Sequence, residues 1–157
     1  MRKRSKYKPK GVRLDATTYV LNGFRLVSTT GSAALDLKIK NHSALEALRT
    51  GQAKRYDLDS IISALNVSEA LSRLGIGHEY VDEIKEGQDA LLELSRRGIN
   101  RDDRFVAKAS ELTAINYVMA LHDAMLEITT IGELEKALDI VTKEIMMRRA
   151  RPILEKT

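Results

Sequence analysis

The chain has 157 residues, a length that suits one domain with a self-supporting hydrophobic core. It contains no cysteine, which excludes disulfides, thiolate metal sites and thiol catalysis. Aromatic residues make up only 4% and there is no tryptophan, which argues against an RNA-binding sheet that stacks bases on aromatic rings.

The first 13 residues form a basic arm. They contain seven basic residues and no acidic one, whereas the rest of the chain contains 19 basic and 22 acidic residues. The positive net charge of the chain therefore belongs to the arm. No apolar segment typical of a secretory signal follows the arm, and no apolar run approaches the roughly 20 residues of a membrane span. We therefore expect a cytoplasmic protein that does not enter a membrane.

The arm is the candidate nucleic-acid-binding site. Lysine and arginine side chains neutralise phosphates and release counterions, and a tyrosine ring can stack on a base. Two alternatives stay open for the same charge: an arm that docks on an acidic protein surface, and a solvated tail without a partner. The candidate binding residues are Arg2, Lys3, Arg4, Lys6, Tyr7, Lys8, Lys10 and Arg13.

Residues 14–30 form a lead-in between the arm and the rest of the chain. β-Branched and apolar residues on both sides of Asn22-Gly23 predict a hairpin with a type I′ turn. The alternative is an extended segment that covers the helices. A single hairpin is not stable in water, so either form would pack against the helical part.

Residues 31–151 are predicted to form a helical bundle domain, followed by a short tail over residues 152–157. The chain has two prolines, Pro9 and Pro152, and neither interrupts this region. The first helix is expected over residues 30–50. Its N-cap is expected among Ser28, Thr29 and Thr30, and Gly51 lies where a helix commonly ends.

The second helical segment is expected over residues 57–97, from Asp57 to the stop at Arg96-Arg97-Gly98. Gly75 and Gly77 interrupt it, so the segment is either one kinked helix or two helices that meet at the glycines. An unbroken helix of about 41 residues would reach ~60 Å, which exceeds the diameter of a compact domain of this size. A homodimer, in which a second chain covers the excess, is therefore one expectation, and folding back at the glycines is the alternative.

A polar loop is expected over residues 99–108, and a last helical region begins near Ser110. Within that region Thr130 and Glu133 form a T-x-x-E capping box, which predicts a restart. Together the segments predict an all-α bundle of three to five helices, mostly antiparallel. The residues that we expect to be buried include Leu65, Leu71, Ile115, Leu134 and Leu138.

Residues 61–74 resemble the first half of a helix-turn-helix, with Asn66 at the turn position. The second half does not fit, because Ser72 and Gly75 fall where a recognition helix needs bulky apolar side chains. One continuous helix with an exposed Asn66 is the favoured interpretation.

The three histidines are the candidate metal ligands. His42 and Glu46 are four residues apart on a predicted helix, and so are His78 and Asp82, a spacing that can bind a metal. Glu-x-x-His pairs, as in di-iron bundles, are not formed at any of the three. His122 lies on an apolar helix face and is expected to be a hydrogen-bonded core residue. We therefore assign no metal and no cofactor.

Catalytic signatures are also missing: there is no nucleophile elbow, no phosphate-binding loop and no dinucleotide fingerprint. The acidic pair Asp102-Asp103 lies between Arg101 and Arg104, which is typical of a solvated charged turn. We expect a protein that is not an enzyme.

The segments RKRSKYKPKGVR, LKIKNHSALEAL and ISALNVSEALSRLGIGHEY resemble a group of small proteins encoded by tailed bacteriophages. The resemblance covers most of the chain. It implies a setting, the cytoplasm of an infected bacterium, and action by binding host machinery or nucleic acid, but it assigns no binding residues. The expected function is a non-enzymatic regulator that associates with nucleic acid through its arm. The alternatives are a modulator or inhibitor of a host factor that acts through a helix face, and a structural helical oligomer.

Overall fold

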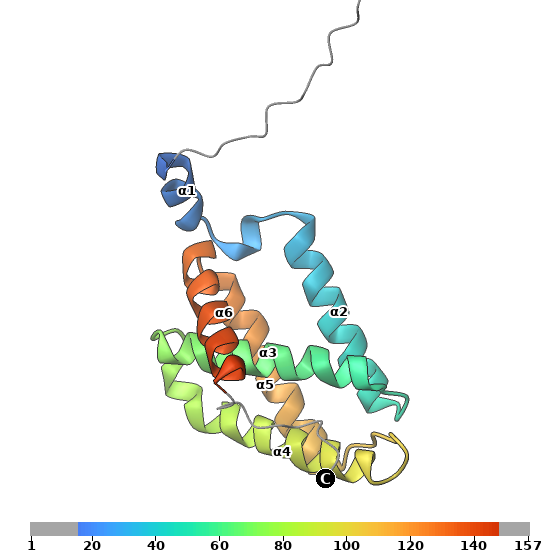
Figure 1. The fold of residues 1–157 in the computed structure, drawn as a ribbon. Coiled ribbons are helices and arrows are strands. Elements are labelled where there is room, and N and C mark those ends of the chain that lie inside the picture. The colour runs from blue at the N-terminus through green and yellow to red at the C-terminus, as the bar shows by residue number, and fades with distance from the viewer. Residues whose placement is uncertain (1–15, 148–157) are drawn as a thin grey trace, which may run out of the picture.

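The computed structural model describes residues 16–147, with side chains from residue 20 onward, and these residues form an all-α bundle (Figure 1). The basic arm and the tail over residues 152–157 lie outside the described residues. The bundle has six α-helices, more than the three to five expected. They are α1 (Ala16–Gly23), α2 (Ser32–Arg49), α3 (Arg55–Arg73), α4 (Val81–Ile99), α5 (Ala109–Ile128) and α6 (Ile131–Met146), with short 3-10 helices η1 (Val27–Thr29) and η2 (His78–Tyr80).

Helix α3 lies at the centre of the bundle and contacts α2, α4, α5 and α6 (Figure 1). Its apolar residues recur at helical spacing, and Leu58, Ile61, Leu65 and Leu71 are completely buried. Helix α4 packs along α5, and α5 crosses α3 to complete the main core. A smaller apolar cluster lies under α6. Among the residues of α6 that the structure describes, Ala137 is the one that is buried. Most side chains of α6 are therefore at least partly exposed.

The segment over residues 57–97 is two helices that fold back on one another. Gly75 and Gly77 separate α3 from α4, with φ angles of 95° and 70° that only glycine adopts without strain. The homodimer argument based on one overlong helix therefore no longer applies. Helix α3 begins at Arg55 rather than at Asp57, because the Asp57 carboxylate reaches back and accepts a hydrogen bond of 2.8 Å from the Lys54 backbone N–H.

The predicted N-caps of the first helix are wrong, although its extent is nearly as expected. Helix α2 begins after Gly31, with no side-chain cap. The hydroxyls of Thr29 and Thr30 instead donate to backbone carbonyls three residues earlier, inside the η1 turn, and Ser28 also lies within η1. At the other end Gly51 has a φ of 70° and ends the helix as predicted.

The lead-in is neither a hairpin nor a simple extended segment. Residues 16–23 form α1, so Asn22-Gly23 ends a helix instead of joining two strands. The strand-like contact of this segment is a single bridge from Leu26 to Thr130. Two backbone hydrogen bonds flank that bridge, because the Val27 N–H donates to Thr129 at 2.9 Å and the Ile131 N–H donates to the Arg25 carbonyl at 2.8 Å. The pairing partner of the lead-in is thus the α5–α6 junction.

Gly98 does not end α4, and the loop after α4 is not simply polar. Gly98 lies inside the helix and is buried. The Phe105 ring packs so closely against it that a Cβ at this position would lie 2.7 Å from Cε1 of that ring. Phe105 is 1% exposed and anchors the loop in the core, and it also bridges to Ala53. The glycine is therefore required by close packing of a ring, rather than by a turn.

Two ion pairs fix the same loop. In the first, the Asp103 carboxylate accepts two hydrogen bonds from Arg55, at 2.7 and 2.8 Å. Asp102 and Asp103 both have positive φ angles, 55° and 61°. Arg97 donates to both carboxylate oxygens of Glu111, at 2.6 and 2.8 Å. Burial would raise the pKa of Glu111, but the hydrogen bonds from Arg97 and the Lys108 backbone exceed this effect, and the pKa lies below its ordinary value. Asp102 and Asp103 were expected to be solvated, but Asp103 is paired with Arg55.

The restart between the last two helices is confirmed. The Glu133 carboxylate accepts the Thr130 N–H at 2.8 Å, and the Thr130 hydroxyl accepts the Glu133 N–H at 3.3 Å, which is a reciprocal capping box. Among the five residues expected in the core, Leu65, Leu71 and Ile115 are buried, Leu134 is half-buried, and Leu138 is 47% exposed. The prediction for Leu138 is wrong, because no helix of residues 16–147 covers that face of α6.

Candidate binding groove

Helix α2 diverges from α5 and α6 and leaves a groove above α3. The second half of α2 packs on α3 through Ala44 and Leu48, whereas no side chain of residues 32–40 is buried. Figure 1 places α2 and α6 on opposite sides of the bundle. Between them lies a cavity of about 410 Å³, which we call the α2–α6 groove. It is lined by Leu37, Lys40 and Asn41 of α2, by α3 from Tyr56 to Val67, by His122 and Leu126 of α5, and by Leu134 and Leu138 of α6.

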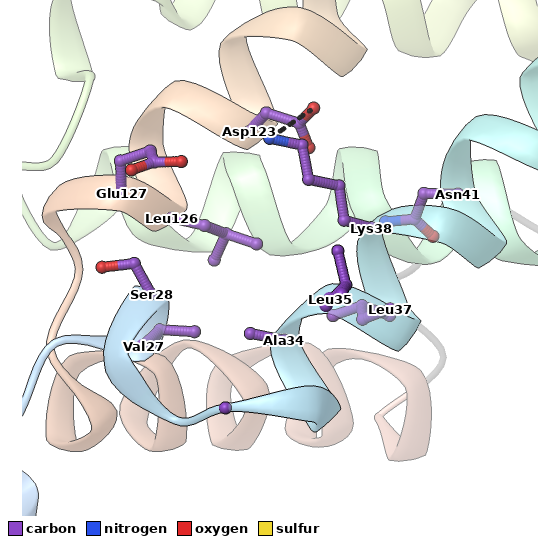
Figure 2. Close-up of a pocket in the computed structure, with 11 residues that line it drawn as sticks. Val27, Ser28, Ala34, Leu35, Leu37, Lys38, Asn41, Asp123, Leu126 and Glu127 are labelled. Atoms are coloured by element: carbon purple, nitrogen blue, oxygen red, sulfur yellow. Dashed lines mark ion pairs between the residues drawn. The ribbon is translucent and has the colours of Figure 1, made fainter.

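A second cavity adjoins the groove. This α2–α5 pocket has a volume of about 240 Å³ and shares Leu37, Asn41 and Leu126 with the groove. Figure 2 shows Val27 and Leu126 on one side of the pocket and Leu37, with its neighbours Ala34 and Leu35, on the other. The two cavities therefore make one extended apolar depression along α2.

The walls of this depression expose large apolar side chains. Leu37 is 41% exposed, Leu138 47% and Tyr56 68%, and Leu35 in the adjoining pocket is 58% exposed. Scattered apolar residues are normal on protein surfaces, but a concave group of them is typical of an interaction site. Of these residues, Leu138 was expected in the core.

The wall of the groove also contains a buried polar side chain, His122, which is 2% exposed. Its Nδ1 lies 3.0 Å from the Ser68 hydroxyl, which in turn donates its only proton to the Ala64 carbonyl at 2.9 Å. With the Ser68 proton on the Ala64 carbonyl, Nδ1 carries the ring proton and donates to Ser68. Nε2 is then a bare acceptor, and it has no hydrogen-bond partner among the residues that the structure describes.

The imidazole is neutral at physiological pH. Burial lowers the pKa of His122 to about 4, and the neighbouring Asp123 carboxylate and the Ala64 carbonyl only partly oppose that shift. The Asp123 carboxylate is engaged elsewhere, because it lies 2.6 Å from Nε2 of His42. It also lies 3.9 Å from the Lys38 ammonium group (Figure 2). The expectation of a hydrogen-bonded core histidine is thus confirmed for Nδ1 and not for Nε2.

Charges on the walls are separated by sign. The charged residues that α2 contributes to the two cavities are Lys38 and Lys40, whereas α3 and α5 contribute Asp59, Asp123 and Glu127. A ligand in the depression therefore meets positive charge on one side and negative charge on the other.

The Ser68–His122 contact is not arranged for nucleophilic catalysis. A serine nucleophile must give its proton to the histidine, whereas here Ser68 accepts a hydrogen bond from Nδ1 and donates its own to a carbonyl. Ser68 is also completely buried, so that a substrate cannot reach its hydroxyl. The arrangement can bind a hydrogen-bond donor but cannot activate the serine.

The histidine pairs expected at metal-binding spacing have other partners. His42 contacts Asp123, while Glu46 accepts two hydrogen bonds from Arg49 at 2.6 and 2.7 Å. His78 is exposed and lies 3.5 Å from Glu79. Within residues 16–147, no three histidine or acidic side chains come close enough together to hold a metal.

The favoured interpretation of one continuous helix is confirmed and the helix-turn-helix alternative is wrong, because α3 continues through Asn66 without a turn. Asn66 is half-buried rather than exposed, and its amide oxygen accepts a hydrogen bond of 3.4 Å from Gln88 of α4. The polar residue thus joins two packed helices of the bundle.

The eight candidate nucleic-acid-binding residues of the arm, from Arg2 to Arg13, lie outside the described residues. Between residues 16 and 147, no helix combines the length and apolar character that a membrane crossing requires. No known protein family, curated protein or solved structure matches the chain.

Proposed function

We propose that the protein is a non-enzymatic binding protein whose α2–α6 groove receives an amphipathic helix of a protein partner. The observation that carries this proposal is the groove itself, an open cavity of about 410 Å³ with exposed apolar walls. In the bacteriophage setting that the sequence resemblance implies, the partner is a host protein and the compartment is the host cytoplasm.

The shape and charge of the groove favour a helix as its occupant. An amphipathic helix presents apolar side chains three and four residues apart, which is the standard way of filling such a groove. Lys40 on one wall and Asp59 on the other favour a helix with acidic residues along one edge of its apolar face and basic residues along the other. A nucleic-acid backbone has negative charge on both edges and would be repelled by the carboxylates, so we assign the groove to a protein.

Photo-crosslinking followed by a binding measurement tests the proposal. A photoreactive amino acid at position 138 should crosslink to one partner protein, which is then purified and titrated against the protein. Leu138→Glu should weaken binding at least tenfold, about 1.4 kcal/mol, because it places a charge in the apolar wall. The matched control is Val106→Glu, which changes an apolar residue of similar exposure (54%, against 47% for Leu138) outside the groove and should leave the affinity unchanged.

Other outcomes would reassign the groove. Equal losses in the two variants would reject the groove as the docking site. A dimer of the isolated chain that Leu138→Glu dissociates, measured by light scattering, would assign the groove to a second copy. Binding that strengthens when residues 148–157 are deleted would show that the chain's own tail occupies it.

A second candidate function is association with nucleic acid through the arm. The specific observation is charge separation: residues 16–147 contain 15 basic and 20 acidic residues, a net charge of −5, against seven basic residues in the arm. The arm, and not the bundle, would then supply the phosphate contacts. Affinity for duplex DNA and for single-stranded RNA, measured against salt concentration with and without residues 1–13, tests this candidate.

A further inference from the structure

We infer that the partner helix anchors in the groove with an indole side chain, a tryptophan, whose N–H donates to Nε2 of His122. This inference rests on the proposed docking of a helix in the α2–α6 groove. It follows from Nε2 of His122, the one fully buried side-chain nitrogen or oxygen of the groove lining that the described residues leave without a partner.

The protonation of His122 fixes what the site requires. Nδ1 donates to Ser68, so Nε2 presents a lone pair and accepts a hydrogen bond. The pKa of His122, about 4, keeps the ring neutral at physiological pH. A neutral ring with a lone pair at Nε2 binds a hydrogen-bond donor and not an anion. Nε2 is the ring nitrogen on the side away from Ser68, and His122 belongs to the groove lining. Nε2 itself has almost no accessible surface in this structure, so side-chain rotamer changes of the size common on binding must open the path by which the donor reaches it.

The surroundings of His122 restrict the donor to an apolar side chain. Leu126, Leu134 and Leu138 line the same cavity, so a lysine or arginine that donates to Nε2 would lose hydration among apolar side chains and gain only a neutral acceptor there. Phenylalanine and leucine would fill the space but leave Nε2 unpaired. Serine and threonine are too short to reach a buried nitrogen from a helix backbone.

Tryptophan fits better than tyrosine because an indole N–H is only a donor. A phenol would bring an oxygen that itself needs a donor, and two nearby hydroxyls are not free to supply one. Ser60 donates to the Tyr56 carbonyl at 3.0 Å, and Ser63 donates to the Asp59 carbonyl at 2.8 Å. The chain itself contains no tryptophan, so a second copy cannot provide this anchor.

Isosteric probes test the inference on the unmodified protein. Benzothiophene has nearly the shape of indole, and 1-methylindole adds one methyl group at the ring nitrogen; only indole has the N–H. We expect indole to bind at least tenfold more tightly than the other two in titrations followed by NMR. We also expect it to shift the Nε2 resonance of His122 in protein labelled with ¹⁵N-histidine. His122→Phe should abolish the preference for indole, and Tyr117→Phe, a matched change on α5 outside the groove, should preserve it.

The outcomes separate this inference from the proposed function. Equal affinities for the three probes, or an Nε2 resonance that does not move, would overturn the indole anchor. Tighter binding of phenol than of indole would replace tryptophan with tyrosine and also overturn it. If partner binding is lost in Leu138→Glu while the probes show no preference, the groove stands and only the anchor is rejected. If partner binding ignores Leu138→Glu, the proposed function itself fails.

Discussion

Replacing His122 with leucine is expected to remove a large part of the acid sensitivity of the fold. The pKa of His122 is about 4 in the native state against an ordinary value of 6.5. Above pH 6.5 neither state binds the proton. Between pH 6.5 and 4 only the unfolded chain binds it, so the free energy of unfolding falls by about 1.4 kcal/mol per pH unit as the pH is lowered. Across the whole window the loss is roughly 3 kcal/mol, and it stops below pH 4.

Urea denaturation at pH 7 and at pH 4.5 measures this effect. The wild-type protein should lose more stability between the two pH values than His122→Leu does. Carboxylates with lowered pKa values, such as Glu69 and Glu111, also lose stabilisation in acid, but they do so in both proteins. Asp123 and His42, the titratable neighbours of His122, are likewise present in both. His78→Leu, at an exposed histidine, is the matched control and should keep the wild-type pH dependence. Equal losses in wild type and His122→Leu would refute the assignment of a neutral buried imidazole.

Three further predictions concern local packing, capping and the arm. Gly98→Ala should lower the free energy of unfolding by roughly 1–3 kcal/mol in urea denaturation, because overlap with the Phe105 ring exceeds the helix-propensity gain of about 1 kcal/mol; a stabilised variant would show that the loop moves aside. Thr130→Ala should cost about 1 kcal/mol in the same assay, because Glu133 loses its capping partner, and an unchanged midpoint would show that the cap contributes nothing. Deleting residues 1–13 should leave the circular dichroism spectrum and the free energy of unfolding unchanged and remove most binding to duplex DNA. A truncated protein that binds as tightly as the full chain would reject the arm as the binding site.

Helix boundaries were predictable where a side chain or a glycine determines them locally. The T-x-x-E sequence at Thr130 needs only residues within one turn, and the structure contains that capping box. Gly51 and Gly75 adopt positive φ angles for the same local reason, because the backbone there is strained for any other residue. These features depend on short-range chemistry, and a sequence contains all of it.

Features that depend on contacts between distant segments were not predictable. Gly98 looked like a helix stop after two arginines, but its function is to make room for Phe105, which lies across a loop. The Asn22-Gly23 pair favours a hairpin only if the flanking segments pair with each other, whereas Leu26 pairs with the α5–α6 junction instead. In both cases the local preference is real, and a tertiary contact determines the result.

The groove was missed for a more general reason. A helical apolar stripe shows which face of a helix avoids water, but not what covers that face. Leu134 and Leu138 continue the stripe of α6, and Leu37 belongs to that of α2, so each is indistinguishable in the sequence from a core residue. Only the divergence of α2 from α6 shows that these faces have no cover in the described part of the chain.

The structure also indicates why the groove stays open. Backbone hydrogen bonds from Val27 and to Arg25 attach the segment before α2 to the α5–α6 junction. After α2, the bridge from Ala53 to Phe105 attaches the chain to the loop between α4 and α5. Because α2 is fixed at both ends, it cannot close onto α6 without breaking one of these attachments. A partner helix would therefore enter a preformed site, and little of its binding free energy would be spent on ordering the receptor.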